Sequence, residues 1–194
     1  MRLEWPRWVW RYRIGQTRIR VYPTGLAALC LVQYVIGLVL LWMLPMWVAI
    51  LTPEPITRVT LGARRLDWFR AVVYIPLAVV GTVVHELGHV VGARLAGTPA
   101  KSFVLGSHGR IYSETPATPG GQLFLKGSGP LAALAYGSLL LIAATAVTTP
   151  VGAAGVWAVG NAVANMLPLP PANSDGMSSW RAIRALSAAR HPHR

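Results

Sequence analysis

The stretch Val84-His85-Glu86-Leu87-Gly88-His89-Val90 carries two histidines and a glutamate inside a long apolar run. On a helix, residues four positions apart lie one above the other, so His85 and His89 present their imidazoles on one face. This spacing predicts a metal site, and zinc suits it because zinc binds imidazole nitrogen at about 2.0–2.1 Å. Glu86 can then act as general base on a metal-bound water, whose pKa the metal lowers to about 7.

The surroundings of this motif strengthen the interpretation. The run that contains it extends from about Phe69 to Ala96 and is otherwise almost uncharged. Ionisable side chains inside a membrane span are energetically unfavourable unless they are paired or belong to a functional site. Three of them within five residues are therefore best explained by one common site. A buried ion pair to an arginine is the structural alternative, but the other apolar runs offer no obvious partner. Metal binding is therefore the favoured hypothesis.

The composition places the whole chain in a membrane. Of its 194 residues, 54% are hydrophobic and 12% are charged, whereas soluble domains contain about 25% charged residues. An ordinary soluble enzyme and a disordered chain are therefore excluded. We expect one mainly α-helical, polytopic membrane domain with about four transmembrane helices and a small cytoplasmic β-hairpin or sheet. The predicted spans are residues 25–51, 69–96, 129–147 and 151–169.

The charge distribution predicts the orientation in the membrane. Eighteen basic residues face six acidic ones, which gives a net charge of +12. Most of the surplus lies in the N-terminal segment 1–24, the loop 97–128 and the tail 175–194, which all fall on one side if the chain crosses the membrane four times. The positive-inside rule makes that side cytoplasmic, although the basic loop 52–68 argues against it. Both termini are then cytoplasmic, and anionic lipid is a more natural partner than nucleic acid.

Shorter elements outside the spans can also be predicted. Alternating aromatic and basic residues over Trp8–Ile14 and Thr17–Tyr22, separated by Gly15-Gln16, predict a β-hairpin. A second strand pair is expected at 102–105 and 110–113. The tail from Gly176 to Arg190 has a modest amphipathic pattern and predicts a basic helix that lies on the membrane surface.

Two histidines do not complete a catalytic zinc site, which usually has three protein ligands and a water. The candidates for the third ligand are His108, Glu114, Asp175, His191 and His193. Asp175 is favoured because the prolines before it end the fourth apolar run where the chain turns back, and His108 is the main alternative. The segment Asn173-Ser-Asp-Gly176 is also a good turn and helix cap without any metal.

The motif and the segment Asn165-Met-Leu-Pro-Leu-Pro170, followed by Asp175-Gly176, resemble the site-2 proteases, which are intramembrane zinc metalloproteases. The resemblance covers about residues 81–177. It implies that His85, His89 and Asp175 bind one zinc ion, that Glu86 is the catalytic base and that Asn165 positions the substrate. It also implies a membrane-spanning substrate cut near the cytoplasmic face, such as a tethered regulator or a sigma-factor antagonist.

The chain departs from the commonest pattern of this family in several places. Four residues separate Pro170 from Asp175 instead of two, Ala133 stands where an asparagine often follows Gly129-Pro130, and Met177 replaces a frequent glycine. Nothing is inserted between the third and fourth runs, which indicates a small branch without a PDZ domain. The alternative hypothesis is an inactive metal-binding adaptor or a transporter, although a transporter would need more acidic residues within its spans.

Overall fold

A computed structural model describes residues 9–14, 17–51, 68–106, 109–113, 116, 118–144, 149–168 and 174–190. Helices dominate these residues, as the sequence predicts. The helices are α1 (Pro23–Leu51), α3 (Trp68–Leu95), α4 (Pro119–Ala144), α5 (Thr149–Met166) and α6 (Asp175–Arg190). The helix predicted for the tail is therefore confirmed as α6, and the HELGH motif lies in the C-terminal half of α3.

The number of membrane spans differs from the expected four. Among the described residues, three helical stretches are long and apolar enough to cross a bilayer: Pro23–Leu41, Val72–Leu95 and Pro119–Ala144. Helix α5, the fourth predicted span, forms but is not among them. Its Asn161 and Asn165 and its many small residues lower its hydropathy, and it packs against α4 and α3. The chain is a mainly helical membrane protein with three clear spans and α5 as a further helix of the bundle.

Helix α4 begins at Pro119, ten residues before the predicted start of the third span at 129, so the loop after α3 ends at residue 118 and not at 128. From the sequence alone, residues 119–128 belong to the predicted loop 97–128, and three of them are glycines. In the structure Pro119 takes the first helical position, where the missing N–H is not needed. The glycines of α3 let α4 approach closely, because a Cβ on Gly88 would lie 2.5 Å from the Ser128 carbonyl oxygen. Helix–helix packing thus stabilises a helix that local propensity disfavours.

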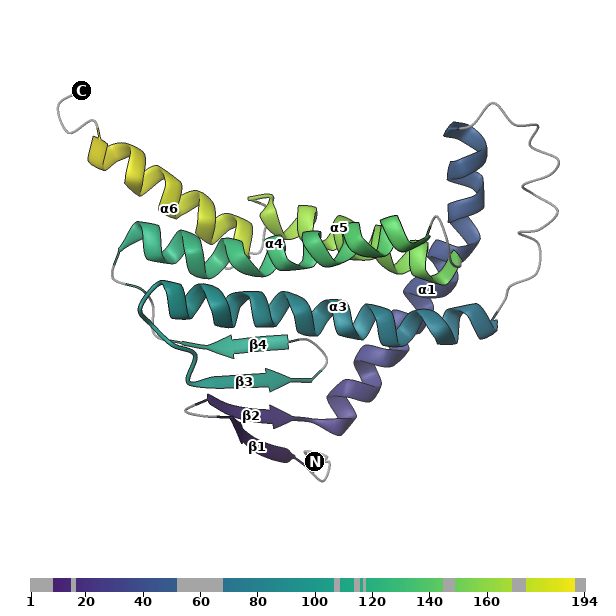
Figure 1. Cartoon of the computed structure of the whole chain (residues 1–194), viewed down its shortest axis with the longest axis horizontal. Coiled ribbons are helices and arrows are strands. Elements are labelled where there is room, and N and C mark those ends of the chain that lie inside the picture. Colours follow the sequence, from purple (N-terminus) through teal and green to yellow (C-terminus); the bar gives the residue numbers. More distant parts are fainter. Residues whose placement is uncertain are drawn as a thin grey trace, which may run out of the picture.

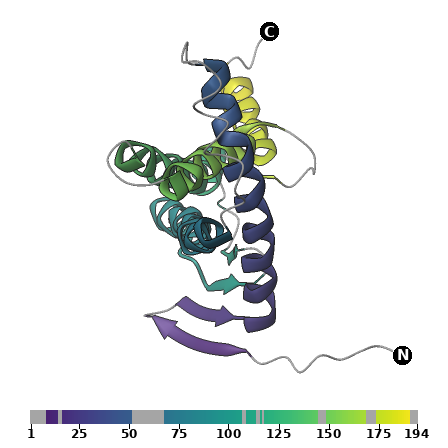
Figure 2. The ribbon, with the colours of Figure 1, turned by 90° about the vertical axis from the view of Figure 1, so that its right-hand side faces the viewer.

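The helical bundle has a simple arrangement. Helices α3, α4 and α5 run side by side, and α1 crosses them obliquely (Figure 1). The view along the bundle shows α3 and α4 nearly end-on beside α1 (Figure 2). Tyr74 of α3 is fully buried, and its hydroxyl donates a hydrogen bond to Oε1 of Gln33 at 3.2 Å. The lack of a side chain at Gly37 admits the Tyr74 ring, so α1 and α3 are fixed to each other in the core.

The strands form one four-stranded sheet in the order β1-β2-β3-β4. The predicted hairpin is confirmed as antiparallel β1 (Trp10–Ile14) and β2 (Thr17–Val21), and the second predicted pair as β3 (Ser102–Leu105) and β4 (Gly109–Tyr112). Strands β2 and β3 pair in parallel, which joins the two hairpins. The sheet lies along the C-terminal half of α3 with β4 next to the helix, beside the HELGH motif (Figure 1).

Candidate metal centre

The structure brings His85, His89 and Asp175 together. One ligand atom from each of them lies within 4.8 Å of the others. Oδ2 of Asp175 lies 3.0 Å from Nε2 of His89 and 3.4 Å from Nε2 of His85. The histidines come from adjacent turns of α3, as their spacing predicts, and the aspartate is the first residue of α6, 86 positions after His89. All three side chains are at most 15% exposed.

Helix α4 holds His89 in this orientation. The Leu125 carbonyl oxygen lies 2.6 Å from Nδ1 of His89. Because a carbonyl oxygen can only accept, Nδ1 carries a proton and donates a hydrogen bond to it. Nε2 then faces Asp175 at the centre of the cluster, and once it loses its proton its lone pair would be directed at a metal ion there, as expected for a metal-binding histidine. The ring also needs the space beside Gly129, because a Cβ at that position would overlap Nε2 of His89. Among the described residues, Nδ1 of His85 is the buried side-chain atom that has no hydrogen-bond partner.

Local geometry at the start of α6 places Asp175. Ser174 precedes the helix, and its hydroxyl oxygen accepts a hydrogen bond from the Met177 N–H at 3.2 Å, which is a helix N-cap. Gly176 packs directly on the backbone of Leu167, where no side chain would fit. Burial alone would raise the pKa of Asp175, but the hydrogen bonds from His85 and His89 and the nearby lysine outweigh it and hold this pKa below its usual value. Asp175 is therefore ionised, as a ligand must be.

Lys126 is a member of the site that sequence reasoning missed. Its Nζ lies 3.3 Å from Oδ1 of Asp175, which leaves Oδ2 facing the two histidines. The sequence pattern predicts that the third span begins at residue 129. Lys126 was therefore assigned to the preceding loop and counted only toward the positive charge of that loop. Once α4 is known to be helical there, Lys126 falls three residues before Gly129 and so on the same face. A lysine on the same face of α4 as Gly129, which packs against His89, is the signal that could have identified it.

The three residues fit a zinc ion. Two atoms bound to one tetrahedral zinc at about 2.0–2.2 Å are about 3.3–3.6 Å apart, close to the 3.0 Å and 3.4 Å between Oδ2 and the imidazole nitrogens. Two imidazoles and a carboxylate are a ligand set that catalytic zinc sites use, with the fourth position open to water. The buried cluster thus provides ligands of the right type, number and spacing.

Glu86 lies beside the three ligands but outside their cluster. It is 9% exposed, and its side chain contacts β4 so closely that a Cβ on Gly109 would overlap its Cγ. Strand β4 therefore borders the site, and glycine at its first position leaves room for the carboxylate. This position suits a group that moves a proton near the metal without binding it.

The other predicted site residues have different outcomes. Asn165 is in the last turn of α5, where its side-chain N–H donates to the Asn161 carbonyl at 2.9 Å, and it is not part of the three-residue cluster. Its role in substrate binding stays a prediction. His108, Glu114, His191 and His193 lie outside the described residues. The two extra residues before Asp175 lie there as well, and Asp175 still reaches the histidines.

Comparison with known proteins agrees with this arrangement. No family model and no curated protein matches the sequence. Among solved structures, the chain is similar to the site-2 protease from Methanocaldococcus jannaschii, with a TM-score of 0.54 and 20% sequence identity. The match covers 92% of this chain and 73% of that one. The resemblance inferred from the HELGH and Asp-Gly motifs is thus matched over almost the whole chain, which has the site-2 protease fold.

Proposed function

We propose that the protein is an intramembrane zinc metalloendopeptidase that cleaves membrane-spanning proteins near the cytoplasmic face. The observation that carries this proposal is the convergence of His85, His89 and Asp175, from two helices far apart in the sequence, with Glu86 beside them. The site-2 protease fold supports it independently of the motif.

The residues of the site divide the work of peptide hydrolysis. His85, His89 and Asp175 would hold the zinc ion, which polarises the scissile carbonyl and makes a water acidic enough to lose its proton near neutral pH. Glu86 accepts that proton and returns it to the leaving amine. Lys126 holds Oδ1 of Asp175. Asn165 would bind the substrate backbone.

The substrate must present an extended segment, because the peptide bonds of a helix are covered by their own hydrogen bonds. Strand β4 is at the end of the sheet order, with α3 and Glu86 beside it. We therefore propose that the substrate adds to β4 as a further strand, which would bring its backbone to the metal centre.

A photo-reactive amino acid at Ile111 of β4 should crosslink a single-span reporter protein, whereas the same group at Tyr12 of β1, on the opposite edge, should give little product. Mass spectrometry of the crosslinked peptides identifies the contact. A third probe on the lipid-facing side of α4, at Leu139, completes the test, and crosslinking from Leu139 but not from Ile111 would contradict this mode of docking.

The same proposal covers location and partners. The protein would lie in a bacterial cell membrane with both termini in the cytoplasm, as the basic segments predict. Its substrate would be a membrane-tethered regulator or a sigma-factor antagonist, and anionic lipid would surround the basic segments. An inactive adaptor that binds metal is the second candidate, favoured by Ala133 and Met177, which depart from the family pattern.

Metal analysis of the purified protein tests the site. The wild type should contain about one zinc ion per chain. Asp175→Ala removes one of three ligands, so its zinc affinity should fall by more than the roughly 10–100-fold that loss of a supporting hydrogen bond costs. Ser178→Ala, on the same turn of α6, is the control and should bind zinc normally. Unchanged zinc binding by Asp175→Ala would remove this residue from the site.

A further inference from the structure

Lys126 is more exposed than the buried cluster that it contacts. Its side chain is 36% exposed, whereas those of His85, His89 and Asp175 are at most 15% exposed. Its Nζ donates a hydrogen bond to Oδ1 of Asp175 at 3.3 Å. A lysine ammonium has three N–H donors, and this bond uses one of them. The other two can therefore reach a molecule that binds at the metal centre.

The charge of Lys126 exceeds what is needed to hold Asp175. A divalent ion would be balanced by the carboxylates of Asp175 and Glu86, since histidines bind metal as neutral ligands. Lys126 then adds one uncompensated positive charge beside the ion. A neutral amide or hydroxyl could donate to Oδ1 equally well without repelling the metal. The ammonium charge is thus unfavourable for metal binding alone and is best explained by a second role.

Glu86 and Lys126 approach the ligands from different sides. Gly88 of α3 packs on the Ser128 carbonyl of α4, which is the helix that carries Lys126. Successive residues of an α-helix are about 100° apart, so Glu86 is about 160° around α3 from Gly88. Its side chain accordingly contacts Gly109 of β4. The proton acceptor is thus on the β4 side of the metal centre, and the cation is on the α4 side.

Peptide hydrolysis moves negative charge away from Glu86. As the water oxygen bonds to the scissile carbonyl carbon, the water proton passes to Glu86 and the π electrons of the carbonyl move to its oxygen. Glu86 loses the negative charge that the carbonyl oxygen gains, and the total charge is unchanged. A fixed cation on the side away from Glu86 therefore stabilises the transition state more than the bound substrate. Lys126 is a cation in that position.

We propose that Lys126 is a catalytic residue whose ammonium stabilises the negative charge that develops on the oxygen of the scissile carbonyl. The ammonium keeps its hydrogen bond to Oδ1 of Asp175 and donates a second one to the substrate oxygen. Preorganised donors of this kind contribute about 10²–10³-fold to kcat. This role rests on the protease function proposed above and assigns that reaction a further residue.

The first test is kinetic and uses the full-length protein in detergent, at saturating zinc, with a single-span reporter. Lys126→Met keeps the length of the side chain and removes its charge, whereas Lys126→Arg keeps the charge. Lys126→Met should lower kcat by about 10²–10³-fold with little change in KM, because the interaction forms only in the transition state. Lys126→Arg should retain most of the activity.

The second test measures binding without turnover, in a Glu86→Gln background. Its ligands are the uncleaved reporter and a phosphinic peptide with the same sequence around the mapped cleavage site, which carries a negative tetrahedral group in place of the carbonyl. Lys126→Met should weaken phosphinate binding by about the factor lost from kcat and leave reporter binding unchanged. Zinc affinity, measured by competition with a chelator, should fall by no more than the roughly 10–100-fold that loss of a supporting hydrogen bond costs.

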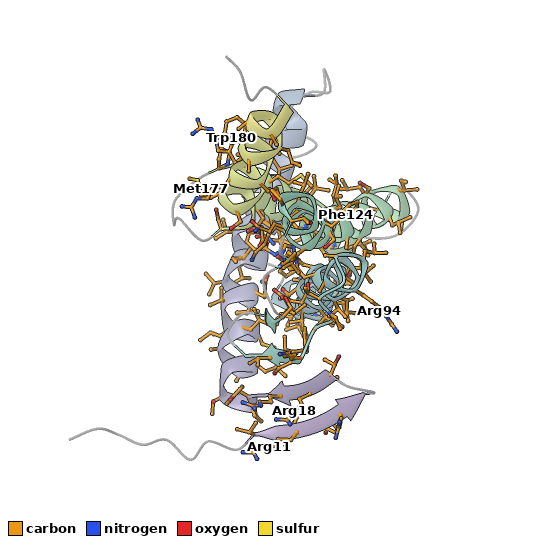
Figure 3. The ribbon with its side chains drawn as sticks, turned by 90° about the vertical axis from the view of Figure 1, so that its left-hand side faces the viewer. Arg11, Arg18, Arg94, Phe124, Met177 and Trp180 are labelled. Atoms are coloured by element: carbon orange, nitrogen blue, oxygen red, sulfur yellow. The ribbon has the colours of Figure 1, made fainter. Side chains whose placement is uncertain are left out.

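Arg94→Met is the matched control, because Arg94 is exposed in the last turn of α3 and points away from the bundle (Figure 3). It also removes one positive charge, and it should leave kcat and phosphinate binding unchanged. Wild-type kcat in Lys126→Met once zinc is saturating would overturn the proposal and leave the lysine only the positioning of Asp175. A raised KM with unchanged kcat would overturn it in favour of recognition of a substrate side chain. Absence of cleavage by the zinc-loaded wild type would contradict the protease function itself, whereas equal rates in wild type and Lys126→Met would contradict only the role of Lys126.

Discussion

Glu86→Gln is expected to lower the rate of cleavage of a single-span reporter by about 10²–10⁴-fold, which is the range that general-base catalysis contributes. Glutamine keeps the size of the side chain and its contact with β4 at Gly109, but it cannot accept a proton. Zinc content should not change, because His85, His89 and Asp175 remain in place. The measurement is the cleavage rate and the zinc stoichiometry of the same preparation in detergent.

Leu87→Ala is a suitable control for this variant, because Leu87 is the next residue of α3 and is half exposed on the outside of the bundle. It should retain both zinc and activity. Loss of zinc in Glu86→Gln would make the glutamate a ligand or a structural partner. Undiminished cleavage would end the protease proposal, and zinc binding without any cleavage in the wild type would leave the metal-binding adaptor as the better account.

The parts of the molecule that the sequence predicted are those with a local signal. The helical periodicity of His85 and His89 determined their common face before any contact was known. The proline-rich turn before Asp175 indicated that the chain reverses there, and the alternation of residues 10–21 predicted the hairpin. In each case the pattern within about twenty residues carries the information, because helix faces and strand faces follow directly from backbone period.

The parts that it did not predict depend on contacts between distant segments. The parallel pairing of β2 with β3 joins segments about 80 residues apart and leaves no mark in either segment. The early start of α4 depends on the close approach of α3 at Gly88, which overrides the low helix propensity of its glycines. Lys126 was missed for the same reason. A residue can be recognised as part of a site only after the element that carries it is placed.

Gly129 shows how strongly the metal centre depends on this packing, and Gly129→Ala is expected to abolish zinc binding. The added methyl group would overlap Nε2 of His89. The ring cannot turn aside without losing the hydrogen bond from Nδ1 to the Leu125 carbonyl. Nor can α4 retreat easily, since Gly88 of α3 is in close contact with Gly129 itself. Zinc affinity, measured by competition with a chelator, should fall below detection, together with reporter cleavage.

Gly127→Ala is the matched control, with the same change two residues earlier on the same helix. A Cβ at Gly127 would meet no atom within 4 Å, so zinc binding should be unaffected. Alanine also has the higher helix propensity, which should raise the free energy of unfolding by up to about 1 kcal/mol. If Gly129→Ala bound zinc as tightly as Gly127→Ala, then either His89 would not be a ligand or the two helices would be further apart than the glycine contacts require. If only Gly129→Ala loses zinc, the close packing of α3 and α4 is itself a requirement of the metal site.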